Sequence, residues 1–201
     1  MRFIGITGGV GAGKSQILAY LAKRPVTRVM LADEIAHKLM EPGTDCYEKL
    51  RNRFLHEDIY LEDGHFDRNK LASAIFADDE KREALNTIVH PAVKEYVCVQ
   101  AEKERKEGRI SLLVLEAALL IEEHYDEICD ELWYIYTSRE VRRERLKASR
   151  GYSDARVDRI FASQLSEEQY RSHCSEVIDN NGALEETLAQ IEEALRRKAY
   201  E

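Results

Sequence analysis

The stretch Gly8-Gly9-Val10-Gly11-Ala12-Gly13-Lys14-Ser15 decides the fold of this chain of 201 residues. It matches GxxxxGK[ST] in full, a pattern in which glycines let successive backbone N–H groups turn toward a phosphate. The short apolar run from Arg2 to Thr7 precedes it and is typical of a buried strand. Apolar residues at helical spacing follow from Ser15 until Pro25 interrupts them. Because this phosphate loop lies between a strand and a helix, the sequence predicts a site for a nucleoside triphosphate.

The phosphate loop also indicates which side chains would do the chemistry. Lys14 can bridge the β- and γ-phosphates, and the Ser15 hydroxyl can hold Mg²⁺. The alternative is an ordinary glycine-rich turn that happens to contain Lys-Ser. The loop alone does not separate kinases, GTPases and motor ATPases. A GTPase normally needs NKxD after a strand, and the nearest string, Asn69-Lys70-Leu71-Ala72, fails at its last position, so GTP is disfavoured.

The rest of the chain alternates strand and helix patterns, which is typical of a parallel sheet covered by helices. We therefore predict an α/β fold, a doubly wound parallel five-stranded sheet, in one domain over residues 1–201. Strands are expected at Arg2–Thr7, Thr27–Leu31, Ile110–Leu115, Leu132–Tyr136 and Val177–Asp179. The core would comprise residues 1–43, 109–138 and 174–201, with a helical insertion at 44–108 and a lid at 139–173. Within the insertion, a helix is expected to begin at Pro91, since proline is favourable in a first helical turn.

Composition excludes several classes of protein. Lys and Arg total 30 against 38 Asp and Glu, a net charge of −8, which argues against wholesale binding to nucleic acid. The four cysteines, at positions 46, 98, 129 and 174, form no CxxC pair, so a zinc or redox motif is not indicated. No secretory segment and no membrane span is visible. We expect a cytoplasmic protein with no nucleic acid, membrane or obligate protein partner.

Two carboxylates stand at places where a kinase needs them. Asp33 follows the second predicted strand, where it could act as a general base, or cap the next helix, or do both. Glu116 ends the third predicted strand, and a carboxylate there can hold the metal directly or through water. The alternative for Glu116 is a solvent-facing charge at a strand end.

The segment 139–150 concentrates positive charge. It carries six cations, Arg139, Arg142, Arg143, Arg145, Lys147 and Arg150, against Glu140 and Glu144. Most would form a solvated helix face. One or two could serve a closing kinase lid, and Arg145 is the first candidate.

Taken in order, these motifs resemble the dephospho-CoA kinase family, and the resemblance extends along the whole chain. Matching pieces beyond the phosphate loop are Ala32-Asp33, Glu41-Pro42-Gly43, Asp67-Arg68, His90-Pro91, Arg145-Leu146, Gln164 and Ile178-Asp179-Asn180-Asn181-Gly182. Three positions depart from the family pattern: Leu31 stands where Asp is frequent, Ala118 where Pro is, and Ser149 where a second lid arginine is.

The resemblance implies a P-loop kinase with a helical substrate-binding subdomain and a lid. It implies transfer from ATP, with Mg²⁺, to the ribose 3′-hydroxyl of dephospho-CoA, the last step of coenzyme A biosynthesis. Asp33 would be the base, with Lys14 and Arg145 as further catalytic groups, and Ser15 and Glu116 as metal ligands. Arg68 and His90 would join Asp33 in binding the acceptor. The ATP-binding residues would be Gly9, Gly11, Ala12, Gly13, Lys14, Ser15, Gln16 and Asn180.

Two alternatives stay open from the sequence. One is another P-loop kinase, acting on nucleosides or nucleotides. The other is a nucleotide- or CoA-binding sensor without transfer activity, which the joint presence of Lys14, Ser15, Asp33 and Glu116 disfavours.

Overall fold

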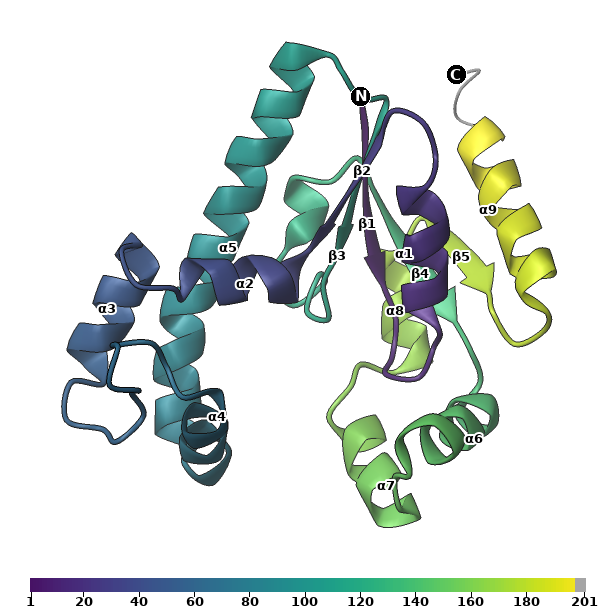
Figure 1. Cartoon of the computed structure of the whole chain (residues 1–201). Coiled ribbons are helices and arrows are strands. Elements are labelled where there is room, and N and C mark those ends of the chain that lie inside the picture. Colours follow the sequence, from purple (N-terminus) through teal and green to yellow (C-terminus); the bar gives the residue numbers. More distant parts are fainter. Residues whose placement is uncertain (198–201) are drawn as a thin grey trace. The chain divides into compact units, whose positions relative to one another are not determined.

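The computed structural model describes residues 1–197. A five-stranded sheet in the order β2-β3-β1-β4-β5 forms its framework (Figure 1). The strands are β1 (Arg2–Thr7), β2 (Thr27–Leu31), β3 (Leu112–Glu116), β4 (Glu131–Tyr136) and β5 (Glu176–Asp179). β1 pairs in parallel with β3 and with β4, and β4 pairs in parallel with β5. The predicted five-stranded α/β sheet is therefore confirmed, although β3 begins at Leu112 and not at Ile110.

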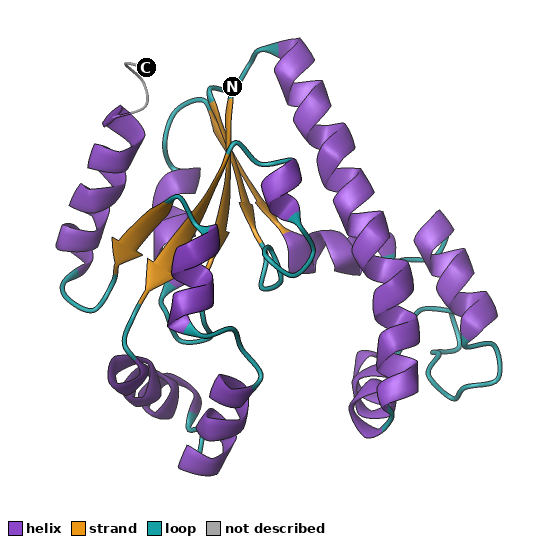
Figure 2. Ribbon diagram, turned by 180° about the vertical axis from the view of Figure 1, so that it is seen from behind, coloured by secondary structure: helices purple, strands orange, loops and turns teal. Residues whose placement is uncertain are grey.

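The chain divides into two compact units, Met1–Val29 with Glu107–Glu201, and Met30–Lys106. In the first unit, α1 lies on one face of the sheet and α8 on the other (Figures 1 and 2), so the sheet is covered on both sides. The helices of this unit are α1 (Lys14–Ala22), α6 (Arg139–Arg150), α7 (Asp154–Ala162), α8 (Glu167–His173) and α9 (Leu184–Arg197), with a 3₁₀ turn, η1, at Tyr125–Glu127.

The strand order of the sheet indicates where a ligand would bind in the first unit. The parallel strands β1, β3 and β4 are almost completely buried, as expected for strands covered by helices on both faces. Ligands of such sheets bind outside the carboxyl ends of the strands, where connections leave in opposite directions. The phosphate loop follows the carboxyl end of β1, and Glu116 lies at the carboxyl end of β3.

The second unit is helical apart from the end of β2. It contains α2 (Ala32–Leu39), α3 (Asp45–Arg53), α4 (Arg68–Ala77) and α5 (Asp79–Glu107). Only the last residue of α5, Glu107, belongs to the first unit. The Thr44 side chain accepts a hydrogen bond from the Tyr47 N–H and caps α3. Tyr47 packs edge-on against Phe66 with their ring centroids 5.4 Å apart, which joins α3 to the loop before α4.

The helix expected to begin at Pro91 begins instead at Asp79, and that prediction is wrong. Asp78 provides the true start, since its Oδ1 accepts hydrogen bonds from Glu80 N at 2.9 Å and Lys81 N at 3.1 Å. Pro91 lies inside α5, where its ring removes one backbone donor. Apolar side chains continue at intervals of four on both sides of it, and their burial offsets that loss. They are Val89, Val93, Val97 and Ala101.

No helix within residues 1–197 is both long and apolar enough to cross a membrane.

Candidate functional site

The phosphate loop is shaped by a glycine at the start of α1. Gly13 occupies the N-cap position with φ +85°, a conformation that glycine adopts without steric cost. A Cβ at this position would lie 2.4 Å from Asn180 Nδ2, so any larger residue would have to displace the Asn180 side chain. The loop closes with a hydrogen bond from Ala12 N to Gly9 O at 3.1 Å. The first turn of α1 therefore directs backbone N–H groups and the positive end of the helix dipole toward the loop, an arrangement that binds anions.

Lys14 and Glu116 lie together at this loop. Lys14 Nζ donates a hydrogen bond to Gly8 O at 2.7 Å and lies 3.5 Å from Glu116 Oε1. The Glu116 side chain is only 18% exposed, so the interpretation as a solvent-facing charge is wrong. The structure thus brings the predicted lysine and the predicted metal-binding carboxylate into one ion pair beside the loop.

Asn180, which directly follows β5, holds the phosphate loop from another part of the chain. Its side chain is buried, donates from Nδ2 to Ala12 O at 2.7 Å, and accepts at Oδ1 from Thr187 Oγ1 at 2.8 Å. The Thr137 hydroxyl lies 3.2 Å from both Ala12 O and Asn180 O. Arg145 Nη2 donates to Asn180 O at 2.9 Å. The predicted residues Asn180 and Arg145 therefore meet at the loop, where Asn180 contacts its backbone.

Sequence reasoning did not single out Arg142, which contacts the loop directly. Its Nε donates to Val10 O at 2.9 Å, and its Nη2 donates to Gln164 Oε1. The guanidinium lies 4.5 Å from the centroid of the Phe161 ring. Only 8% of the residue is exposed, and this burial lowers the pKa of Arg142. The signal available in the sequence was its spacing of four from Leu146, which is buried on the same face of α6.

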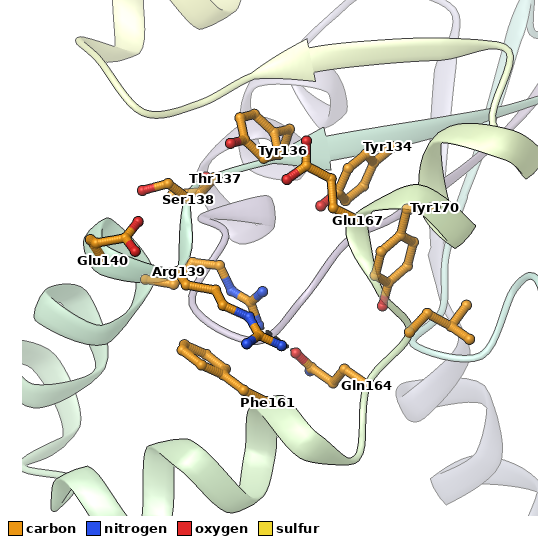
Figure 3. A pocket seen from close by; sticks show the side chains of 12 residues that line it. Tyr134, Tyr136, Thr137, Ser138, Arg139, Glu140, Phe161, Gln164, Glu167 and Tyr170 are labelled. Carbon is orange, nitrogen blue, oxygen red and sulfur yellow. Dashed lines mark hydrogen bonds between the residues drawn. The ribbon is translucent and has the colours of Figure 1, made fainter.

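Arg142 also lines a cavity of about 230 Å³. Aromatic rings form much of its wall, and the Tyr134 and Tyr170 rings stack with centroids 4.6 Å apart. Burial raises the pKa of Tyr134 to about 12, so its hydroxyl is neutral at physiological pH. Figure 3 shows the lining, which comprises Tyr134, Tyr136, Thr137, Ser138, Arg139, Glu140, Arg142, Phe161, Gln164, Leu165, Glu167 and Tyr170.

Two other cations of α6 bind α7 instead. Arg143 contacts Asp154 at 3.0 Å and Asp158 at 2.5 Å, and Lys147 contacts Asp154 at 2.9 Å. Lys147 and Arg143 hold the pKa of Asp154 below its usual range. The cations of α6 therefore divide by face, with Arg142 and Arg145 toward the loop and the Asn180 segment, and Arg143 and Lys147 toward α7.

The predicted acceptor residues lie in the second unit. Asp33 is exposed in the first turn of α2, whose N-cap is Leu31 without a side-chain hydrogen bond. The capping interpretation of Asp33 is therefore wrong, because its carboxylate does not cap the N-terminus of α2. Arg68 begins α4, is exposed, and follows the capping residue Asp67, while His90 lies half-buried within α5.

Ser15 lies exposed in the first turn of α1, and Gln16 follows it. Over residues 1–197 no cluster of three or more His, Cys, Asp or Glu side chains could hold a metal ion by itself. A metal at this site would therefore depend on few protein ligands together with phosphate oxygens, which is how proteins commonly bind Mg²⁺.

A phosphate loop after β1, a carboxylate at the end of β3 and an arginine-bearing helix pair after β4 define a P-loop kinase. Two solved structures share the fold over almost the whole chain. TT1252 from Thermus thermophilus matches with a TM-score of 0.74 at 28% identity, covering 98% of this chain and 97% of that one. A dephospho-CoA kinase from Campylobacter jejuni matches with a TM-score of 0.68 at 21% identity, covering 96% and 94%.

Sequence comparison identifies the family. The sequence model of dephospho-CoA kinase matches residues 2–186. A dephospho-CoA kinase from Symbiobacterium thermophilum is 38% identical over 196 residues, which cover 98% of this chain and 81% of the relative. The chain belongs to the dephospho-CoA kinase family, and the resemblance found in the sequence is confirmed.

Proposed function

We propose that the chain transfers the γ-phosphoryl group of ATP to the ribose 3′-hydroxyl of dephospho-CoA, which gives coenzyme A and ADP. The observation that carries this proposal is the complete phosphate loop, with Lys14 paired to Glu116, in a chain that matches the family from residue 2 to residue 186. This reaction is the last step of coenzyme A biosynthesis. We expect it to take place in the cytoplasm.

The first unit would bind ATP. Loop N–H groups and Lys14 offer positive charge to the β- and γ-phosphates, where charge changes during transfer. Arg145 is proposed to add a second cation from α6. Gly9, Gly11, Ala12, Gly13, Ser15 and Gln16 belong to the same loop and helix start, and Asn180 supports the loop through Ala12 O.

Ser15 and Glu116 are the residues that we propose hold Mg²⁺. A hydroxyl and a carboxylate are hard oxygen donors, which suit this ion, and Glu116 lies 3.5 Å from the phosphate-binding lysine. When bound, the ion would neutralise negative charge on the phosphates during transfer.

Asp33 is proposed as the general base. Its carboxylate would take the proton of the acceptor hydroxyl as that oxygen bonds to the γ-phosphorus and ADP leaves. Arg68 and His90 are proposed to bind the acceptor in the helical second unit. Residues 139–173 would act as the lid over the phosphates.

The test is ADP release from ATP and Mg²⁺ with and without dephospho-CoA, with the product mass measured in parallel. ADP that depends on the acceptor, with a product one phosphoryl group heavier, is expected. If ATP binds but dephospho-CoA gains no mass, the acceptor assignment fails. The same assay with nucleosides and nucleotides then distinguishes a different small-molecule kinase from a sensor without transfer activity.

A further inference from the structure

We propose that Arg142 is a positioning residue, which holds the first half of the phosphate loop in its ATP-binding conformation through the Val10 carbonyl. This inference rests on the proposed ATP site. It assigns to Arg142 a role distinct from that of Arg145, three residues further along α6, which contacts Asn180 O instead.

The peptide that Arg142 holds has two accessible orientations. Val10 stands between Gly9 and Gly11, and Gly11 has φ +86°. Glycine populates positive and negative φ almost equally, so the peptide between Val10 and Gly11 can turn over at little steric cost. Nε of Arg142 donates to Val10 O at 2.9 Å and favours one of the two orientations.

Fixing this carbonyl also fixes an N–H group. In a planar trans peptide, the C=O of Val10 and the N–H of Gly11 point in opposite directions. With the carbonyl held by Arg142, the Gly11 N–H points away from the guanidinium. Gly11 is one of the proposed ATP-binding residues, and a misplacement of about 1 Å in such a site can cost on the order of 10²-fold in rate.

The close approach of Arg142 to the loop supports a specific fit. A Cβ at Gly9 would lie 2.2 Å from Nη2, 2.3 Å from Cζ and 2.5 Å from Nη1 of Arg142. The guanidinium thus lies directly against the Gly9 backbone on one side. Phe161 and Gln164 hold it on other sides.

A purely structural role would not need this cation. Arg142 is 8% exposed, and it forms no ion pair with a carboxylate anywhere in residues 1–197. Burying a charge is costly, and an apolar side chain of similar volume commonly serves packing as well or better. The polar contacts that justify a guanidinium here are the Val10 carbonyl and the Gln164 side chain that orients it.

The first test compares Arg142→Met, Arg142→Lys and the control Arg197→Met, which changes an exposed arginine of α9. Methionine keeps much of the packing volume against Phe161 but removes every donor, whereas lysine restores one cationic donor. We expect Arg142→Met to raise the KM for ATP about tenfold, which corresponds to about 1.4 kcal/mol, with the KM for dephospho-CoA unchanged. Arg142→Lys should recover part of this loss. Arg197→Met removes an exposed ion pair with Glu176 and should leave both KM values at the wild-type level.

The second test uses the cavity beside Arg142. Arg142→Ala leaves a space that adjoins the existing cavity of about 230 Å³, which can admit a small cation from solution. We expect N-ethylguanidinium to restore ATP affinity in Arg142→Ala, measured by calorimetry, and ethylammonium to restore less because it is a compact cation without the planar array of donors. Arg197→Ala should show no response to either.

A wild-type KM for ATP in Arg142→Met would overturn the proposal, as would a lowered unfolding temperature with no change in that KM. If Arg142→Met does not fold, Arg142→Lys and Gln164→Leu decide the matter, since both should raise the KM for ATP and neither removes a proposed ATP ligand. The proposed function itself fails only if the wild-type chain does not transfer phosphate, which the same assay measures first.

Discussion

At the scale of single residues, Asp33 shows how structure decides between two readings of one side chain. Aspartate after a strand suits both a helix N-cap and a general base, so the sequence pattern could not choose. The backbone places Leu31 at the N-cap and Asp33 two residues later in the first turn, exposed. The capping role is thereby removed, and the proposed proton transfer is left to be tested.

Replacement of Asp33 by Asn tests that role directly. Asparagine has nearly the same shape but cannot accept the hydroxyl proton, so kcat should fall by about 10²–10⁴-fold. ATP affinity, measured by calorimetry, should stay near the wild-type value. Glu34→Gln is the matched control, because Glu34 is also an exposed carboxylate in the first turn of α2 and should tolerate the change. Equal kcat values for the two variants would contradict the assignment of the base.

Arg142 marks the limit of prediction at this scale. Charge counting located the cluster at 139–150, and its members differ only in which face of α6 they occupy. Spacing from Leu146 shows that Arg142 shares a buried face, but not that a carbonyl of the phosphate loop, 132 residues earlier in the chain, would receive its hydrogen bond. Contacts of such long range depend on the packed fold and not on local pattern.

At the scale of elements, α6 and α7 depend on a small apolar cluster of their own. Leu146, Val157 and Phe161 are buried together, and Val10 of the phosphate loop packs against them. Deleting a buried leucine side chain typically costs about 2–5 kcal/mol, so Leu146→Ala should destabilise this helix pair by that order.

Amide hydrogen exchange measures the effect by region. Exchange in α6 and α7 should accelerate in Leu146→Ala, while exchange in β1 and β4 should stay slow because the sheet core lies elsewhere. Leu195→Ala in α9 serves as the comparison, since it changes a partly buried leucine far along the chain. Uniform acceleration in all elements of Leu146→Ala would show that the helix pair does not open on its own.

The strands were more predictable than the helices of the second unit. The bounds of β1 and β2 were predicted to the residue. β1 is buried on both faces and therefore reads as a continuous apolar run before the glycines, whereas β2, at the sheet edge, is marked by the Pro25 that precedes it. The start of α5 was predicted twelve residues too late, at Pro91 and not at Asp79, because proline is a strong local signal for a helix start. The Asp78 cap and the buried face formed by Val89 and Val93 prevailed over that signal.

At the scale of the whole molecule, the sequence predicted the alternation of strands and helices but not the extent of the two compact units. The second unit begins at Met30, inside β2, so one strand contributes to both units. No composition change or linker marks this position. The boundary between the two units depends on contacts between residues far apart in the sequence, and local sequence patterns carry little information about such contacts.

This division yields a prediction about ligand and stability, because the single tryptophan, Trp133, is fully buried in β4 of the first unit. Its fluorescence should therefore report unfolding of the unit that contains the phosphate loop. ATP at one hundred times its dissociation constant should raise the free energy of unfolding of this unit by about 2.7 kcal/mol. Denaturant titrations followed at Trp133 measure the change.

Lys14→Ala provides the discriminating comparison, with Lys23→Ala, at the far end of α1, as its control. Without ATP, Lys23→Ala should unfold near the wild-type midpoint, whereas Lys14→Ala should unfold at a lower denaturant concentration because it leaves the largely buried Glu116 carboxylate without its ion pair. With ATP, the midpoint of Lys23→Ala should rise as in the wild type, whereas that of Lys14→Ala should rise much less, because its phosphate-binding cation is gone. An equal rise in all three proteins would place ATP away from the phosphate loop, and the loop would then be a structural turn between β1 and α1.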